Sequence, residues 1–165
     1  MNRPEAPETA LLRSRELRVL PEWIDYNGHL NMAFYNVLFD RGVDDAFVHF
    51  GLGPNYLQAN QASFFTAEVH VCYLRELAEG DAVFSTFHLL DFDDKRAHFF
   101  QSLYHAGEGW LSATSEQMSL HVDMAAKKVA PWHPDVREKL AAVHAAQSSL
   151  PWPERAGRSI GIRRK

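Results

Sequence analysis

The sequence predicts an α+β domain in which one long helix is covered by a curved antiparallel sheet. Three observations predict this fold. Residues 32–50 carry a helical stripe of apolar side chains, four strand-like runs follow between residues 63 and 123, and short turn-forming sequences separate those runs. Because the long helix precedes the strands, we expect it to cover one face of their sheet. A length of 165 residues fits one such domain.

The first fifteen residues contain Pro, Glu and Arg without apolar periodicity, so residues 1–15 are expected to form a loose arm. Residues 17–20 alternate apolar and polar side chains, as in a short strand. Pro21 limits that strand to a sheet edge or a strand end. The folded domain is therefore expected over residues 16–147.

The long helix is predicted from apolar residues spaced three and four apart. These residues are Tyr35, Phe39, Val43, Ala46, Phe47 and Phe50. Gly51 and the pair Gly53-Pro54 are typical of a helix end. A helix over residues 32–50 would be about 28 Å long, enough to cross a whole sheet.

The strand-like runs lie close together in the second half of the chain. They are Ser63–Leu74, Ala82–Asp91, His98–Ala106 and Trp110–Asp123. The separators at 78–81, 93–95 and 107–109 have hairpin-like length, so the runs predict an antiparallel meander. Residues 54–62 are expected to be a polar connection, and 135–147 a short surface helix. The tail, residues 148–165, holds five of the seventeen basic residues.

Composition excludes some classes of function. The net charge of −4 argues against nucleic acid as a partner, because such partners usually require an excess of Lys and Arg. The single cysteine, Cys72, cannot form an intrachain disulfide or a cysteine-based zinc site. No apolar run reaches transmembrane length and no apolar leader is visible. We therefore expect a cytoplasmic protein without metal, cofactor, membrane or nucleic acid.

The chemistry is predicted to lie in residues 25–35. A carboxylate (Asp25), a glycine (Gly28), an imidazole (His29) and an amide (Asn31) directly precede the long helix. A helix N-terminus carries free N–H groups and the positive dipole end, so it can stabilise a developing negative charge. A carboxylate beside such a site is suited to hydrolysing an activated acyl group. The alternative is an Asx-type turn with a helix cap, and local composition favours neither.

The same stretch resembles a known family. Asp25, Gly28 and Tyr35 match the Asp…Gly…Tyr signature of the 4-hydroxybenzoyl-CoA thioesterase-like branch of the hotdog fold. Residues 25–31 are similar to the Asp-x-Asn-Gly-His-x-Asn pattern of acyl thioesterases, and residues 71–81 resemble the family's second-strand segment. The resemblance covers residues 15–130.

A closer resemblance joins residues 22–29, 94–98 and 116–123 to the thioesterases of carnitine and betaine catabolism. That group occurs alone or fused to L-carnitine dehydrogenase. The resemblance implies hydrolysis of a short polar acyl-CoA, betainyl-CoA in particular. It also implies no cofactor and an active site at a subunit interface, so we expect a homodimer or a dimer of dimers.

The resemblance also assigns roles. The aspartate matching Asp25 acts as nucleophile or general base, and the residues do not separate the two. The backbone N–H seven residues later, at Met32, is the oxyanion donor in the family. Gly28 allows a positive φ and a close approach to the acyl group. His29 and Asn31 either orient Asp25 or the attacking water, or they satisfy a backbone carbonyl and cap the helix.

Further candidates come from the first long strand and from aromatic residues. Thr66 and Glu68 are expected on one face of the strand, where Glu68 either complements Asp25 of the partner subunit or is a solvated carboxylate. A betainyl group carries a quaternary ammonium, which aromatic faces attract. Aromatic residues near the motif usually pack in the core, and Trp23 is the preferred candidate for this contact among Trp23, Phe34, Tyr35, Phe64 and Phe65. The basic tail either binds the phosphates of coenzyme A or is a frayed terminus.

Two other functions remain as alternatives to a thioesterase. A hotdog hydratase would carry an imidazole five residues after the aspartate, where this chain has Leu30, so that class is disfavoured. A non-catalytic acyl-CoA-binding module would keep the fold without needing Asp25. A thioesterase for another acyl-CoA or aroyl-CoA is the nearest alternative.

Overall fold

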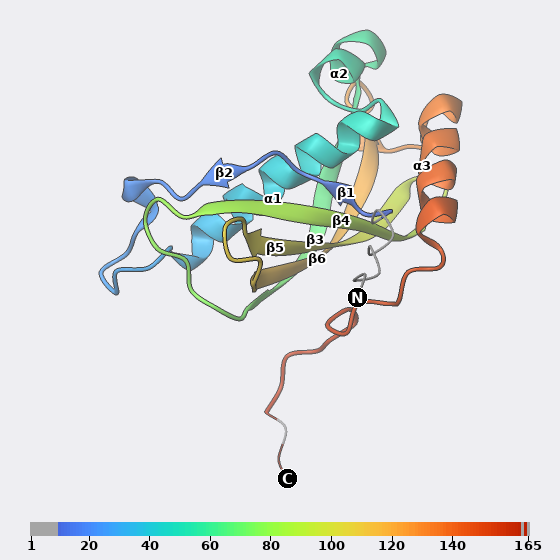
Figure 1. Ribbon diagram of the computed structural model, residues 1–165. Helices are drawn as coiled ribbons and strands as arrows, with labels where there is room; N and C mark the ends of the chain where they lie inside the picture. Colours follow the sequence, from blue (N-terminus) through green and yellow to red (C-terminus); the bar gives the residue numbers. More distant parts are fainter. Residues whose placement is uncertain (1–9, 163, 165) are drawn as a thin grey trace, which may run out of the picture.

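One long helix, α1 (Met32–Phe47), lies across the concave face of an antiparallel sheet in the computed structural model, which describes residues 10–162 and 164 (Figure 1). Helix α3 lies beside one end of the sheet and α2 at the far end of α1 (Figure 1). The other elements are β1 (Leu12–Arg13), β2 (Leu17–Arg18), η1 (Pro21–Trp23), η2 (Val48–Phe50), α2 (Pro54–Asn60), β3 (Ala62–Tyr73), β4 (Ala82–Phe92), β5 (Arg96–His105), β6 (Leu111–Asp123), β7 (Lys128–Val129) and α3 (Pro134–Gln147).

The strand order differs from the predicted meander. The order is β1-β4-β5-β6-β3, with β2 also paired to β4 and β7 to β6. Only β4, β5 and β6 form a meander, so the prediction of a four-stranded meander is wrong. The connection from β3 to β4 is a crossover in which Leu77 is fully buried, and its carbonyl accepts a hydrogen bond from the Leu30 N–H (2.8 Å). A hairpin turn would have left this segment on the surface and β3 beside β4.

The ends of several elements differ from the expected ones. Leu12 and Arg13 pair with β4, so ordered structure begins before residue 16; residues 1–9 of the expected arm lie outside the described residues. The expected polar connection at 54–62 contains helix α2. The expected helix over 32–50 is α-helical to Phe47 and continues as the 3₁₀ turn η2, which ends at Gly51 with φ +78°. A positive φ explains the glycine at that position.

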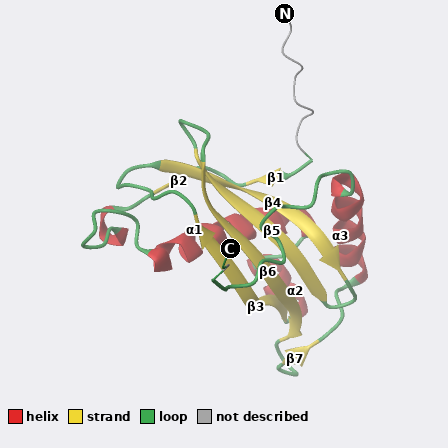
Figure 2. Cartoon of the chain, turned by 90° about the horizontal axis from the view of Figure 1, so that it is seen from below, coloured by secondary structure: helices red, strands yellow, loops and turns green. Residues whose placement is uncertain are grey.

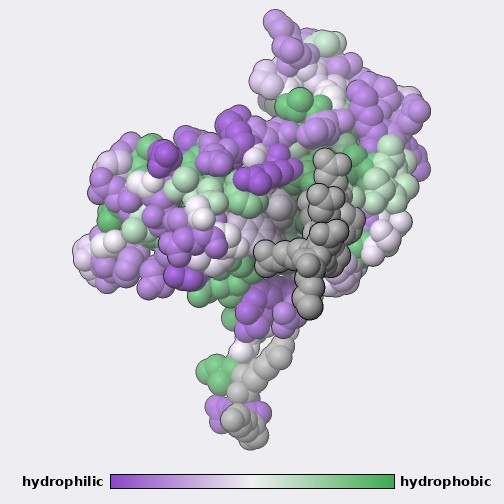
Figure 3. All heavy atoms as spheres, viewed as in Figure 1, coloured by the Kyte–Doolittle hydropathy of each residue, from purple (hydrophilic) through white to green (hydrophobic). Residues whose placement is uncertain are grey.

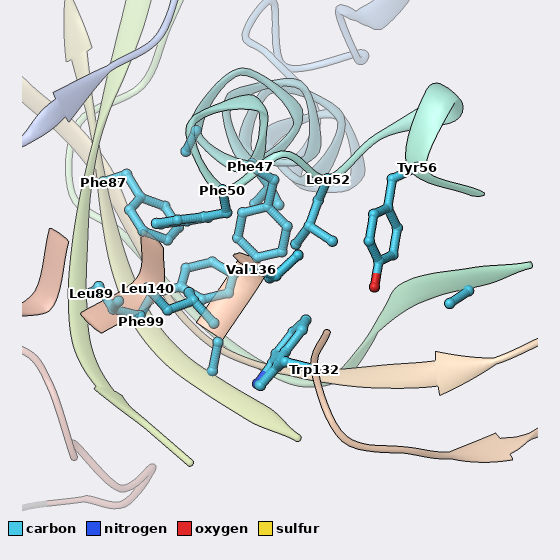
Figure 4. Packing of buried hydrophobic residues seen from close by; sticks show 14 residues of the cluster. Phe47, Phe50, Leu52, Tyr56, Phe87, Leu89, Phe99, Trp132, Val136 and Leu140 are labelled. Atoms are coloured by element: carbon cyan, nitrogen blue, oxygen red, sulfur yellow. The ribbon is translucent and has the colours of Figure 1, made fainter. Parts of the chain in front are cut away.

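The core lies between α1, α3 and the concave face of the sheet. The ring of Phe47 sits 4.2 Å from that of Phe64 and 5.6 Å from that of Phe99, measured between centroids. Figure 4 shows Phe47 and Phe50 from the helical side meeting Phe87 and Phe99 from the sheet. Most of the surface seen in Figure 3 is hydrophilic, as expected when the apolar stripe of α1 faces inward.

A β-bulge divides strand β3. Thr66 is opposite Ser119 of β6, and Glu68 is opposite Met118, so Ala67 has no partner of its own. Directly opposite residues share a face of the sheet, and successive residues of β6 alternate between faces. Thr66 therefore faces α1, and Glu68 faces the outer side. The expectation that Thr66 and Glu68 share one face is wrong because the bulge shifts the alternation by one residue.

The C-terminal tail crosses the outer face of the sheet, the side nearer the viewer in Figure 2. The Gly157 N–H donates to the Glu116 carboxylate (2.7 Å), and the ring of Trp152 lies 6.1 Å from that of His98. The tail as far as Gly157 is thus in contact with the domain, while Arg163 and Lys165 lie outside the described residues. Across the described residues, every helix is too short or too polar to span a membrane.

Candidate active site

The loop before α1 is closed by backbone hydrogen bonds. Ile24 and Leu30 form an antiparallel bridge, and the Asp25 N–H donates to the His29 carbonyl (3.0 Å). Between them the Gly28 N–H donates to the Asp25 carbonyl (3.0 Å), and Gly28 has φ +79°. A residue with a side chain would be strained there, as expected from the sequence. The loop thereby fixes Asp25 a few residues before the helix.

The Asp25 side chain forms the Asx turn that was the alternative interpretation. Its Oδ1 accepts a hydrogen bond from the Asn27 N–H (2.8 Å). The side chain is half-buried, and its other oxygen, Oδ2, has no hydrogen-bond partner within the described part of the chain. One oxygen therefore holds the carboxylate in place while the other remains available as a base or nucleophile.

The first turn of α1 is capped by Asn31, whose Oδ1 accepts from the Ala33 N–H (3.0 Å). This leaves the N–H of Met32, at the first helical position, unpaired among residues 10–162. The Tyr73 hydroxyl donates to the Met32 carbonyl (3.1 Å) and so ties the helix start to strand β3. A free N–H at the positive end of a helix is a donor for an anionic oxygen.

Asp25 and Met32 line one cavity of about 310 Å³ at the start of α1. Its wall includes Tyr35, Tyr73 and Glu76. Burial of the Tyr35 side chain raises the pKa of its phenol above the ordinary value. A reacting carbonyl in this open cavity would lie beside the Asp25 carboxylate and beside Met32, whose N–H is unpaired within the described residues. That combination is the requirement for acyl transfer.

Two other predicted residues lie outside this cavity. Trp23 is 6% exposed, its ring stacks on that of Phe34 (5.5 Å), and the Arg41 guanidinium lies 5.3 Å from its centre. Its faces are thus occupied by other side chains of the same chain. The His29 side chain is exposed, and its ring makes no hydrogen bond within the described residues, so it does not orient Asp25 in one subunit.

Thr66 and Glu68 are separated by the bulge. Thr66 lines a second cavity, of about 420 Å³, between β3 and α1, together with Asn36 and Asp40. Glu68 lines a different cavity on the outer face, with His98 and Glu116. Within one subunit, Glu68 and Asp25 therefore do not meet.

The cavity beside Asp25 also contains residues that sequence reasoning did not select, Tyr73 and Glu76. Tyr73 belongs to the alternating run of β3, which placed it on the same face as Val69 and Val71 but gave no reason to join it to the loop. Glu76 lies in the β3–β4 crossover, which was predicted to be part of a meander. No cluster of three or more potential metal ligands is present in the described part of the chain.

Comparisons with known proteins identify relatives of this chain. Residues 19–140 match the model of the Thioesterase-like superfamily. The chain is 41% identical over 152 residues to a betainyl-CoA thioesterase of Pseudomonas aeruginosa, covering 92% of this chain and 96% of that protein. It is 37% identical over 153 residues to an L-carnitine dehydrogenase/betainyl-CoA thioesterase of Rhizobium meliloti, covering 93% of this chain but 31% of that protein.

A solved structure shares the fold across nearly the whole chain. It is a hypothetical protein from Staphylococcus aureus in complex with CoA, with a TM-score of 0.85 and 29% sequence identity. The match covers 93% of this chain and 96% of that one. Its CoA belongs to that protein, but the likeness extends to the whole helix and sheet that form the cavity described above.

Proposed function

Because this chain belongs to the thioesterase-like superfamily, we propose that it hydrolyses a short polar acyl-CoA, with betainyl-CoA as its preferred substrate. The α+β hotdog fold predicted from the sequence is confirmed. The substrate follows from the Pseudomonas aeruginosa relative, which is similar over nearly its full length. The observation that carries the proposal is that Asp25 and Met32, whose N–H is unpaired within the described residues, line the same cavity.

In the proposed reaction the thioester carbonyl lies between Asp25 and the start of α1. The carbonyl oxygen accepts a hydrogen bond from the Met32 N–H, and this hydrogen bond strengthens as the oxygen becomes negative in the tetrahedral state. Asp25 acts from the opposite side in one of two ways. As a nucleophile it forms an acyl anhydride, expels the CoA thiolate and is regenerated by water. As a general base it takes a proton from the attacking water; the tetrahedral state then collapses, the C–S bond breaks and the CoA thiolate leaves and takes up the proton.

The first test is Asp25→Asn. Under either role this variant should lower kcat by at least about a hundredfold, because an amide can neither accept the proton nor attack. The measurement is thiol release from a panel of betainyl-CoA, hydroxybenzoyl-CoA, and short and long linear acyl-CoAs. Glu22→Gln, which removes an exposed carboxylate three residues away, should retain the wild-type rate. A folded Asp25→Asn variant with the wild-type rate would exclude the catalytic role.

The same panel separates the alternatives. Faster thiol release from hydroxybenzoyl-CoA than from betainyl-CoA would show that the enzyme acts on a different acyl group. Absence of release from every member of the panel, with acyl-CoA binding retained, would indicate a binding module. Preference for betainyl-CoA by at least about tenfold in kcat/KM, which corresponds to 1.4 kcal/mol, would support the proposed substrate.

We further propose that the working unit is a homodimer, alone or as a pair of dimers. Support comes from β3, which is an edge strand with unpaired backbone groups and carries exposed Phe65, Val69 and Tyr73. Such an edge favours pairing with another strand. Pairing two copies along β3 would also cover the groove lined by Thr66 and Asp40.

Sedimentation velocity at micromolar concentration tests the dimer. The wild type should sediment as a dimer or tetramer. Val69→Lys introduces a charge on the 43% exposed edge position and should shift the protein toward monomer. Val48→Lys, at an exposed apolar position in η2, outside β3, is the matched control and should leave the assembly intact. A wild type found only as a monomer would refute the proposal.

A further inference from the structure

The substrate proposed above places a cation very close to the reacting bond, and the inference below rests on that proposal. In a betainyl thioester one methylene separates the quaternary nitrogen from the carbonyl carbon. Standard bond lengths and angles put these two atoms about 2.5 Å apart. The groups that contact the trimethylammonium must therefore line the same cavity as Asp25 and Met32, not a distant pocket.

Two aromatic side chains line that cavity among the described residues, Tyr35 of α1 and Tyr73 of β3. Their ring centroids are 5.0 Å apart, and the ring planes are inclined by 77°. The two rings are thus in edge-to-face contact. Tyr35 is 4% exposed and Tyr73 is 43% exposed, so Tyr35 fixes the position of the Tyr73 ring and Tyr73 is the aromatic side chain that a ligand can reach. An accessible aromatic ring attracts a quaternary ammonium ion.

Charge in the cavity wall also favours a cation. Glu76 adds a second carboxylate to that of Asp25. The basic residue of the wall, Arg75, has its guanidinium 4.0 Å from the ring centre of Trp110, which is not part of the wall. The wall thus presents two carboxylates, while its guanidinium is held against an aromatic ring next to the cavity.

We infer that Tyr73, supported from behind by Tyr35, binds the quaternary ammonium group of the acyl chain together with the Glu76 carboxylate, and that these two residues determine the preference for a cationic substrate. Trp23, the aromatic residue that the sequence favoured for this contact, is covered by Phe34 and Arg41 and does not line the cavity. Tyr73 has a second role, since its hydroxyl holds the Met32 carbonyl. It is therefore a specificity residue that also positions the oxyanion donor.

The two roles of Tyr73 separate by substitution. Tyr73→Phe keeps the aromatic face and removes the hydroxyl, whereas Tyr73→Leu removes both. The paired substrates are betainyl-CoA and 3,3-dimethylbutanoyl-CoA, in which an uncharged carbon replaces the quaternary nitrogen at nearly the same size. The ratio of their kcat/KM values reports the recognition of charge and cancels effects common to both substrates.

In the wild type this ratio should favour betainyl-CoA. Tyr73→Leu should lower the ratio by about 5–30-fold, the range for losing a cation–π contact of about 1–2 kcal/mol. Tyr73→Phe should keep the ratio and lower both kcat/KM values by a similar factor. Glu76→Gln should lower the ratio as well. Phe65→Leu, at an exposed aromatic position of the same strand on the outer face, is the matched control and should leave the ratio unchanged, because weaker pairing along β3 would affect both substrates alike.

A Tyr73→Leu variant that keeps the wild-type ratio would overturn the inference. Failure of the proposed function gives a different result, namely a wild type that releases no thiol from betainyl-CoA. In that case calorimetric binding of the two CoA esters to Asp25→Asn tests the cation site alone. Tighter binding of betainyl-CoA that Tyr73→Leu abolishes would uphold the site, and equal affinities would refute it.

Discussion

Replacing Gly42 by Ala should destabilise the protein, although the same change stabilises most helices. Gly42 is buried in α1 at the point where the helix passes over Ser85 and Gln101 of the sheet. A Cβ at this position would lie 2.7 Å from the Gln101 Nε2 and would overlap the Ser85 hydroxyl. The Gln101 Nε2 donates to the Phe39 carbonyl (3.2 Å), so the methyl group would press on a buried hydrogen bond.

The magnitude follows from three opposing effects. Replacing Gly by Ala inside a helix normally raises the free energy of unfolding by about 1 kcal/mol. Overpacking a buried site costs about 1–3 kcal/mol, and a buried polar group left without its partner costs about 1–3 kcal/mol more. The net expectation is a free energy of unfolding lowered by about 1–5 kcal/mol. Urea denaturation of wild type and variant at one pH and one protein concentration measures it.

A double variant identifies the cause. Ser85→Ala removes the hydroxyl that the new methyl group would overlap, while the Ser85 Cβ stays 3.4 Å away. If the clash is the reason, Gly42→Ala combined with Ser85→Ala should be more stable than the sum of the single effects predicts. Asn36→Ala, at an exposed position of the same helix, should change stability by less than about 0.5 kcal/mol. A Gly42→Ala variant as stable as the wild type would refute the reasoning.

Two further predictions concern His121 and the tail. Burial lowers the pKa of His121, whose ring bonds to the Tyr56 hydroxyl (2.8 Å). The unfolded chain therefore binds more protons, and stability should fall as the pH drops from about 7.5 through the ordinary value of about 6.5. His121→Gln should reduce the dependence of the free energy of unfolding on pH, measured by urea titrations at several pH values, and the exposed His49→Gln should not. An equal pH dependence in all three proteins would contradict this prediction. Glu116→Ala removes the acceptor of the Gly157 N–H, so trypsin should cleave after Arg158 several-fold faster than in wild type or in Glu116→Gln; equal cleavage rates would be the opposing result.

The helix and the long strands could be predicted because their signals are local. A stripe spaced three and four apart, or an alternation over ten residues, is visible within one element. The position of β3 could not be predicted in the same way. Hairpin-like separators favour pairing with the next strand, but β3 is held to β6 by contacts more than forty residues away in the sequence, such as Ala62 with Asp123.

The candidate site was predictable only in part, for a related reason. Asp25, Gly28 and Met32 occupy one short segment, so their spacing alone indicates a loop at a helix start. Tyr73 and Glu76 reach the same cavity from the end of β3 and from the crossover, and no local pattern joins them to Asp25. The bulge at Ala67 could not be predicted from the sequence either, because an alternating run does not indicate which residue lacks a paired residue on the neighbouring strand.

The structural roles of residues 25–31 are compatible with the proposed catalytic ones. The Asx turn occupies one oxygen of Asp25 and the helix cap occupies the side chain of Asn31, which are the structural roles. Those bonds fix the loop, while Oδ2 of Asp25 and the Met32 N–H stay without hydrogen-bond partners in the described residues and their two residues line one cavity. A carboxylate restrained by one oxygen loses little freedom when it reacts through the other, so the turn contributes to the proposed chemistry by preorganisation.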